Sequence, residues 1–355
     1  MSLNKKYVTT FAPLVIGLAL VYTMVVMFMW RPSSTTGLAS TQIDCPTQLA
    51  SINNSSSNSA TFNQRPKIAI LLSYSGDVRD MSIERHSRVY IESVISKQEY
   101  ARRHGYAFFL DSVIDQSRPH WGRLVTAYSI LNSMPWIEWI MYMDIDTIIM
   151  DPSQNLEDLI LKPYLRPTSG EARSQAASSN GTRITDMPPK DYQEIDFIGK
   201  TDCSGRPLNN GVYFIRNTNW TVSMLKKTFN DRTDYVTKVR RPGVQDAMTN
   251  TLLSYTRAEA RHFLMGPKQA TYNKFTKVCT GDPQGKDHWY EDGDFVIHFA
   301  GVVNREDMWA YYIRKMYSTN PSSLHYMLNE LDTKWSGTAK WVSDMKELAK
   351  KIPAQ

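Results

Sequence analysis

Two carboxylates separated by a single residue follow an apolar run in this chain. The run covers residues 139–143, and Asp144 and Asp146 come directly after it. Such a run predicts a buried strand, and open α/β sheets hold their ligands at the carboxyl ends of their strands. Neighbouring carboxylates repel each other and are costly to desolvate, so a hard divalent cation is their natural partner. A diphosphate chelated to that cation would complete the site, which makes a nucleotide-sugar transferase the first hypothesis.

The same spacing also has a simpler interpretation. Asp144 would then be a turn or helix-capping residue, and Asp146 would be solvated. The chain contains a second pair, Asp292 and Asp294, with a glycine between them and an apolar run after them. That order predicts a turn entering a strand. Position at the end of a strand therefore distinguishes the first pair from the second.

His298 lies inside the apolar segment 295–299. A histidine among apolar residues is usually a core residue whose ring nitrogens are hydrogen-bonded. If the fold brings His298 beside Asp144 and Asp146, its imidazole nitrogen would be a third metal ligand. This ligand set suits Mn²⁺ better than Ca²⁺.

Amide side chains precede two further predicted elements. Asn209 and Asn210 stand before Gly211 and an apolar run, so they either close a turn or hydrogen-bond the hydroxyls of a sugar. Gln245 and Asp246 lie in the first turn of a predicted helix. An acid at that position can simply complement the helix dipole.

Apolar runs and helical periodicity alternate along the chain. Strands are predicted at 67–73, 106–110 and 139–143, with helices at 82–103 and 123–134 between them. This order implies right-handed crossovers and a parallel sheet, so the fold class is α/β. Later strands are predicted at 197–198, 211–216 and 295–299, with helices at about 219–230 and 244–256. The polar stretch 151–193 predicts a lid on the acceptor side or a disordered loop.

The N-terminal 65 residues predict a membrane anchor on a stalk. Residues 7–30 carry no charge and are long enough to span a bilayer, with two lysines in the tail 1–6 and an arginine directly after them. This arrangement favours a cytosolic tail and a lumenal globular part, the single-pass type II topology. A cleaved signal peptide is the alternative. The Ser-, Thr- and Asn-rich segment 31–65 predicts a flexible stalk. The layout is that of a Golgi membrane enzyme, and also that of many surface receptors.

Four sequons are candidates for N-glycosylation: Asn53, Asn54, Asn180 and Asn219. Three cysteines exclude a disulfide-dense scaffold and a four-cysteine zinc site. A disulfide between Cys203 and Cys279 would suit an oxidising lumen and leave Cys45 free, although the sequence does not settle the pairing. The formal charge of +6, from 41 basic and 35 acidic residues, is too mild and scattered to indicate nucleic-acid binding.

Six segments together resemble one family. In chain order they are 99–106, 121–124, 139–146, 208–217, 245–247 and 298–301. The chain resembles the fungal α-mannosyl- and α-galactosyltransferases, a family that also includes the plant xyloglucan xylosyltransferases. The resemblance implies a GT-A-type, Rossmann-like catalytic domain, placed at 66–305. It also implies retaining transfer from a nucleotide sugar to a glycan acceptor with Mn²⁺. The tail lies outside the resemblance, and its alternating helical stretches predict a helical extension at 306–355 packed on that domain.

The resemblance also implies roles for individual residues. Asp144, Asp146 and His298 would hold the metal. Asn209 and Gly211 would lie by the donor sugar, with Gln245 near the reacting centre and Asp246 as the alternative nucleophile. The remaining donor-binding candidates are Ser73, Gly76, Arg123, Ile145, Gly301 and Arg305.

Two departures from the family pattern bear on the donor. Val244 stands where the family usually has an acid, so Asp246 would take that part or the acceptor contacts would differ. Val302 and Val303 follow the His-Phe-Ala-Gly turn, where basic residues commonly meet the phosphates, so Arg305 is the nearest cation. Donor identity is left open by these departures, with mannose from GDP-mannose as the first choice and galactose from UDP-galactose as the second.

Two other functions are alternatives to the transferase. A phosphatase of the haloacid dehalogenase type would use Asp144 and Asp146, with the loop 281–287 as its late metal-binding loop. A non-catalytic partner subunit of a Golgi transferase complex would keep the fold without the activity. Even as an enzyme, the protein could associate with other Golgi transferases.

Overall fold

The structure is a computed structural model that describes residues 65–73, 84–111, 119–161, 195–234, 243–256, 258–266, 271–276, 288–302, 305–334 and 340–351. No helix within these ranges is long and apolar enough to cross a membrane. The predicted tail, the anchor and the stalk up to residue 64 lie outside them. Also outside lie Gly76, Asn53, Asn54, Asn180 and the loop 281–287, so the predictions for these residues stay predictions.

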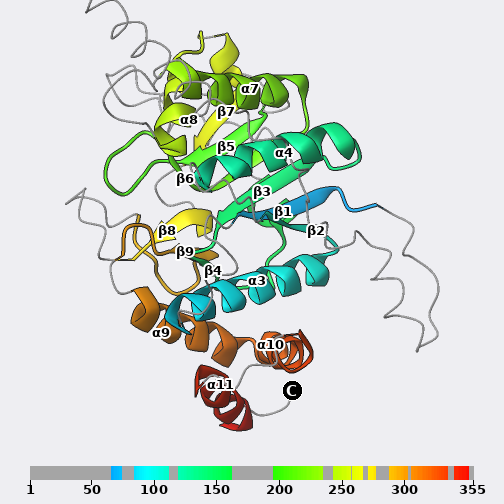
Figure 1. Cartoon of the computed structure of the whole chain (residues 1–355), viewed down its shortest axis with the longest axis vertical. Coiled ribbons are helices and arrows are strands. Elements are labelled where there is room, and N and C mark those ends of the chain that lie inside the picture. The colour runs from blue at the N-terminus through cyan, green and yellow to red at the C-terminus, as the bar shows by residue number, and fades with distance from the viewer. Residues whose placement is uncertain are drawn as a thin grey trace, which may run out of the picture. The chain divides into compact units, whose positions relative to one another are not determined.

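The main sheet has six strands in the order β2-β1-β3-β6-β5-β7 (Figure 1). Their bounds are β1 Ile68–Ser73, β2 Ala107–Asp111, β3 Trp139–Asp144, β5 Phe197–Lys200, β6 Asn209–Arg216 and β7 Phe263–Gly266. Strand β1 pairs in parallel with β2 and with β3. Strand β6 runs antiparallel to β3 and β5, and β7 is parallel to β5. The predicted parallel unit is therefore β2-β1-β3, and the sheet becomes mixed at β6.

Helices cover both faces of this sheet (Figure 1). On one face, α4 (Gly122–Ser133), α7 (Asn219–Asp234) and α8 (Val244–Leu253) share a core cluster that includes Ala69 and Leu71. On the other face, α3 (Glu84–His104) packs in a second cluster that includes Ile68 and Ile70. Alternate residues of β1 thus face opposite clusters, which explains why this strand is apolar without interruption.

A second, three-stranded sheet lies beside the first in the order β4-β9-β8. Its strands are β4 Thr147–Ile149, β8 Lys274–Phe275 and β9 Val296–His298. The helices α9 (Arg305–Thr319), α10 (Pro321–Lys334) and α11 (Lys340–Lys351) join this sheet and α3 in a third core cluster. Single turns complete the described elements: η2 Pro119–Trp121, η3 Glu157–Leu161, η6 Glu259–His262 and η7 Thr271–Asn273.

The structure refines two interpretations of the sequence. Asn209 and Asn210 are the first residues of β6, and Asn209 Oδ1 accepts a hydrogen bond from Gly211 N at 3.0 Å, the side-chain contact that the turn interpretation expects. The strand predicted at 295–299 is β9, Val296–His298, and it pairs with β4 in the small sheet. The interpretation of the second acidic pair is confirmed: Gly293 has a φ of 102°, and Asp294 N donates to Glu291 O in a turn before β9.

Candidate metal centre

Three parallel strands end side by side at the candidate site. Ser73 is in register with Asp111 on one side and with Asp144 on the other, and each residue is the last of its strand. The hydroxyl of Ser73 donates to Asp111 Oδ2 at 3.3 Å. Asp144 therefore lies at the carboxyl edge of the sheet, where α/β folds hold their ligands.

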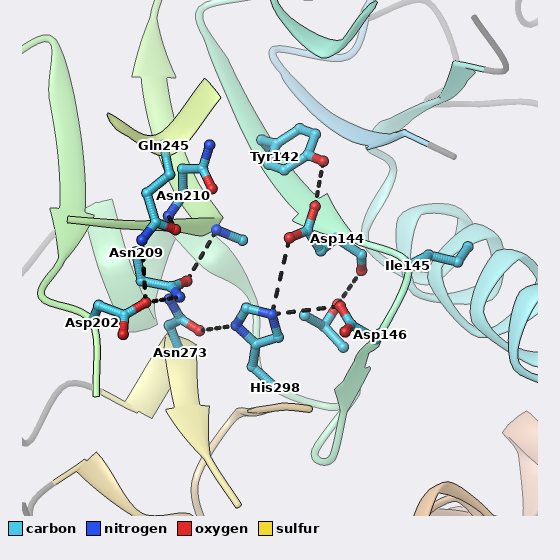
Figure 2. Close-up of polar contacts among 12 residues, drawn as sticks. Tyr142, Asp144, Ile145, Asp146, Asp202, Asn209, Asn210, Gln245, Asn273 and His298 are labelled. Atoms are coloured by element: carbon cyan, nitrogen blue, oxygen red, sulfur yellow. Dashed lines mark hydrogen bonds and ion pairs between the residues drawn. The ribbon is translucent and has the colours of Figure 1, made fainter. Parts of the chain in front are cut away.

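Asp144, Asp146 and His298 converge at this edge (Figure 2). One ligand atom from each residue lies within 4.8 Å of the other two. Nε2 of His298 is 3.5 Å from Asp146 Oδ1 and 4.0 Å from Asp144 Oδ2. The small sheet brings the histidine there, because His298 pairs with Thr147, the residue directly after Asp146.

Gly211 leaves the room in which this cluster forms. A methyl group at this position would overlap Cε1 of His298 and would lie 2.9 Å from Oδ2 of Asp144. Gly211 is on β6, next to the end of β3. The absence of a side chain there lets the imidazole and the carboxylate approach each other from two sheets.

Asp144 is held by two side chains from the main sheet and α4. The hydroxyl of Tyr142 donates to Asp144 Oδ1 at 2.6 Å, and a guanidinium nitrogen of Arg123 lies 3.0 Å from the same oxygen. The Arg123 guanidinium also lies over the Tyr142 ring, 4.6 Å from its centroid. These contacts use Oδ1 and leave Oδ2 directed toward His298.

Asp146 is paired with His298 and Arg305. Arg305 donates to Asp146 Oδ2 at 2.7 Å. Burial opposes ionisation of Asp146, but the hydrogen bond and charge of His298 and the charge of Arg305 outweigh it and lower the pKa to about 2. Burial likewise disfavours the charged imidazole, but Asp146 outweighs it and raises the pKa of His298 above its usual value. Two carboxylates and one imidazole, whose Nε2 proton a cation would displace, fit a divalent transition metal.

A group of amide side chains lies beside the cluster (Figure 2). Asn209 Nδ2 donates to Asp202 Oδ2 at 2.8 Å, and Gln245 Nε2 reaches the same oxygen at 3.4 Å. Asn273 Nδ2 donates to Asn209 Oδ1 at 3.0 Å. Asn209 and Gln245, two of the predicted donor residues, are thus held together by a carboxylate.

Other predicted residues lie around or away from this centre. Asp246 is 51% exposed and faces Arg206, 3.8 Å away, so the structure does not place it in the cluster. The side chain of Ile145 packs toward Leu72, Tyr90 and Val94. Gly301 has a φ of 67° in the exposed turn after β9. Asn219 is exposed at the start of α7.

Sequence reasoning missed four residues of the site. Asp202 and Asn273 lie in irregular or single-turn segments, and Ser93 and Lys97 lie within helix α3. Spacing alone marks none of them. The short distance along the chain between Asp202 and the two asparagines of β6 was the one available signal.

Cys203 follows Asp202 and is disulfide-bonded. The other cysteines of the chain lie outside the described residues, so the predicted pairing with Cys279 stays a prediction.

Asp144 at the end of β3, Asp146 in the turn after it and His298 from the small sheet together form a candidate site for a divalent cation beside a set of amide side chains. The model of the galactosyl transferase GMA12/MNN10 family matches residues 64–309, more than half of the sequence. The chain belongs to this family and is a glycosyltransferase, which confirms the resemblance found in the sequence.

Two curated relatives illustrate the range of the family. The chain is 27% identical to the probable alpha-1,6-mannosyltransferase MNN10 of Saccharomyces cerevisiae, over 73% of this chain and 68% of that protein. It is 28% identical to an alpha-1,2-galactosyltransferase of Schizosaccharomyces pombe, over 60% of this chain and 56% of that protein. The chain thus spans about two thirds of the first relative and little more than half of the second.

Two solved structures are also similar to the chain. One is a glycosyltransferase involved in the glycosylation of the major capsid of PBCV-1, with 15% identity, a TM-score of 0.45, and coverage of 69% of this chain and 98% of that one. The other is the galactosyltransferase LgtC in complex with donor and acceptor sugar analogues, with 11% identity, a TM-score of 0.32, and coverage of 81% and 97%. TM-scores this low do not by themselves establish a shared fold.

Proposed function

We propose that this protein is a retaining glycosyltransferase of GT-A type that moves a hexose from a nucleotide sugar to a glycan acceptor with Mn²⁺. The observation that carries the proposal is the convergence of Asp144, Asp146 and His298 at the carboxyl edge of the sheet. When bound, the cation supplies positive charge that stabilises the negative charge growing on the departing diphosphate.

The surrounding side chains have roles that follow from their contacts. Arg123 holds Asp144 and carries a positive charge that the diphosphate would also meet. Arg305 binds Asp146 directly, so in this geometry it neutralises the carboxylate that the cation would share. With Asp146 held by a cation, the guanidinium of Arg305 would be available to bind a phosphate oxygen.

The amide side chains of Asn209 and Gln245 are suited to binding the sugar of the donor. Asn209 and Gln245 both donate to Asp202, which fixes the direction of their amides, and Asn210 N donates to Gln245 Oε1 at 3.4 Å. Directed amides of this kind hydrogen-bond sugar hydroxyls. Retention requires either a protein nucleophile or attack from the face that the diphosphate leaves. We favour same-face attack, with the leaving phosphate accepting the acceptor's proton. Asp246, which faces solvent and Arg206, remains the alternative nucleophile.

Mannose from GDP-mannose is our first choice of donor, supported by the likeness to a probable alpha-1,6-mannosyltransferase. Galactose from UDP-galactose is the second, supported by the likeness to an alpha-1,2-galactosyltransferase. The uncharged segment 7–30 supports a type II protein of the Golgi membrane with a lumenal catalytic part.

The test is a donor panel with the purified full-length chain and Mn²⁺. Release of the nucleoside diphosphate is measured for each nucleotide sugar in the presence of a mannan or oligomannose acceptor. We expect turnover with one donor, and loss of that turnover in Asp144→Ala, because the cation loses one of its carboxylates. Asp292→Ala is the matched control, since it removes the exposed acid of the second pair, and it should keep full activity.

Three results would contradict the proposal. Full turnover by Asp144→Ala in excess EDTA would exclude a metal-based mechanism. Hydrolysis of a phosphomonoester without any sugar donor would favour the phosphatase. Failure of the wild type to bind either Mn²⁺ or a nucleoside diphosphate would indicate a non-catalytic partner subunit.

A further inference from the structure

A continuous line of hydrogen bonds connects Asp202 to His298 (Figure 2). It runs from Asp202 Oδ2 to Asn209 Nδ2 at 2.8 Å and from Asn209 Oδ1 to Asn273 Nδ2 at 3.0 Å. It ends between Asn273 Oδ1 and His298 Nδ1 at 3.0 Å. All four side chains are at least nine-tenths buried, so solvent does not compete for these bonds.

Asn209 can point in only one direction. Its Nδ2 faces the Asp202 carboxylate, which only accepts hydrogen bonds when ionised. Its Oδ1 faces the backbone N–H of Gly211 at 3.0 Å, which only donates. A flip of the amide would break both contacts and place like groups against each other at each end.

Asp202 stays ionised although it is buried. Burial raises the pKa of its carboxyl, but hydrogen bonds from Ser204, Asn209 and Gln245 outweigh this and lower the pKa below its usual value. Ser204 alone donates twice to Asp202 Oδ1, from its N–H at 2.7 Å and its hydroxyl at 2.5 Å. The ionised carboxylate of Asp202 can therefore only accept hydrogen bonds, and it does so at the start of the line.

The orientation of the Asn209 amide also determines the orientation of Asn273 and the protonation of His298. Asn209 Oδ1 only accepts, so Asn273 must present Nδ2 to it and Oδ1 to the imidazole. A carbonyl oxygen facing Nδ1 requires a proton on that nitrogen. The other nitrogen, Nε2, is the one that faces Asp144 and Asp146.

We propose that Asp202 is a positioning residue that, through Asn209 and Asn273, keeps the proton on His298 Nδ1 and so makes Nε2 the metal-binding atom. This inference rests on the proposed metal-dependent function. It assigns Asp202 and Asn273 a role in metal affinity without contact to the metal. Partners of this kind orient a ligating histidine and fix its tautomer.

The first measurement is the Kd of the metal-free, full-length chain for Mn²⁺ alone. Binding is monitored by the electron paramagnetic resonance signal of the free ion. Asn273→Ala removes the acceptor for Nδ1–H and should raise the Kd by roughly 10- to 100-fold. Asp202→Asn should raise it by on the order of 3- to 10-fold, because its new amide must face a donor, either Ser204 N–H or Asn209 Nδ2. The double variant should bind no more weakly than Asn273→Ala, since both changes act through one line of bonds.

The matched control is Asn217→Ala. Asn217 is a half-buried asparagine that donates to a backbone carbonyl, Ile137 O, at 2.9 Å, but at the opposite end of β3 from Asp144. It should leave Mn²⁺ affinity unchanged. Thermal unfolding of each variant shows that the chain is folded when the affinity is measured.

The second measurement locates the proton without relying on metal affinity. In ¹⁵N-labelled full-length chain, His298 should show a hydrogen-bonded Nδ1–H signal, protected from solvent exchange, both without metal and with diamagnetic Mg²⁺. The signal is identified by its absence in His298→Gln, and it should lose its protection in Asn273→Ala and Asp202→Asn.

Two results would overturn the proposal. One is Mn²⁺ affinity within about twofold of the wild type in both folded Asn273→Ala and folded Asp202→Asn, well below the effect expected of such partners. The other is a wild type that lacks the protected Nδ1–H signal. A wild type that keeps this signal but binds no Mn²⁺ would instead contradict the proposed function, so the two failures are distinguishable.

Discussion

At the scale of single residues, the candidate site depends on an absent side chain as much as on the ligands. Gly211 lies where a Cβ atom would overlap the imidazole of His298 and crowd Asp144. The distances of 3.5 and 4.0 Å between the imidazole and the two carboxylates exist only because β6 carries no side chain at that point. The glycine is therefore needed for space and not for an unusual backbone angle.

Gly211→Ala should reduce Mn²⁺ affinity by more than about tenfold, because His298 or Asp144 must leave its place to admit the methyl group. The measurement is the Kd for Mn²⁺ of the full-length chain. Gly243→Ala is the control, since a Cβ at Gly243 meets nothing within 4 Å, and it should bind as the wild type does. Equal affinity in Gly211→Ala would show that the cluster is not the metal site.

At the scale of elements, helix α3 holds the turn that carries the two aspartates. Ser93 Oγ donates to Ile145 O at 2.6 Å, and Lys97 Nζ donates to Thr147 O at 2.7 Å and to Ser93 Oγ at 2.5 Å. Thr147 Oγ1 donates to Asp144 O at 2.7 Å. Side chains thus bind the carbonyls of three of the four residues 144–147. The spacing of four residues between Ser93 and Lys97 places both on one face of the helix.

The stability of the fold should depend on pH through Lys97. Burial lowers its pKa to about 7, against the opposing charges of Asp146 and Asp144. The pKa of a lysine in an unfolded chain is about 10.4. Between the folded and unfolded pKa values of Lys97, the unfolded chain therefore binds more protons than the folded one. The free energy of unfolding of the wild type should therefore rise relative to that of Lys97→Met as pH increases from about 7 to about 10.

This difference is measured by urea unfolding of both proteins across that pH range. Lys346→Met serves as the surface control, because Lys346 pairs with Asp332 in solvent, and it should change the free energy of unfolding by less than about 0.5 kcal/mol. A wild-type curve that runs parallel to that of Lys97→Met would show that Lys97 does not titrate in this window.

At the scale of the whole molecule, the C-terminal helices support the small sheet that carries half of the site. Trp309 of α9 is fully buried in the cluster that contains Ile148 of β4 and Ile297 of β9. Its indole N–H donates to Glu92 Oε2 of α3 at 2.7 Å. Arg305, the first residue of α9, reaches Asp146. The segment near the end of the family match is therefore part of the structure around the metal centre.

Trp309→Ala should lower the free energy of unfolding by about 3–5 kcal/mol, mainly through the cavity, because Glu92 Oε2 loses the indole N–H but still accepts from Arg88. Tyr311→Ala on the same helix is the matched control, because Tyr311 is 62% exposed, and it should change stability by less than about 0.5 kcal/mol. Urea unfolding of both variants measures the difference. Similar losses of stability in the two variants would mean that α9 does not bury Trp309 and expose Tyr311.

The α/β class, the order of the five strands and helices predicted between residues 67 and 143, and the candidate ligands could be predicted from the sequence alone. The strand β3 is continuously apolar because both of its faces are buried, so hydrophobic periodicity reveals it, and the acids at its end are visible in one dimension. Residue type and the family resemblance both pointed to the His-Phe-Ala-Gly and Asn-Asn-Gly segments, but neither predicted where these segments lie relative to Asp144.

Only the tertiary structure decided which residues meet. Asn273 binds Asn209 and His298, and Ser93 and Lys97 bind the carbonyls of Ile145 and Thr147, in each case between segments far apart in the chain. No local pattern encodes such contacts. Strand direction after β3 and the placement of His298 in a second sheet were likewise decided by long-range pairing. A local preference depends on neighbours in sequence, whereas the convergence of two aspartates, a histidine and their supports depends on the packing of the entire domain.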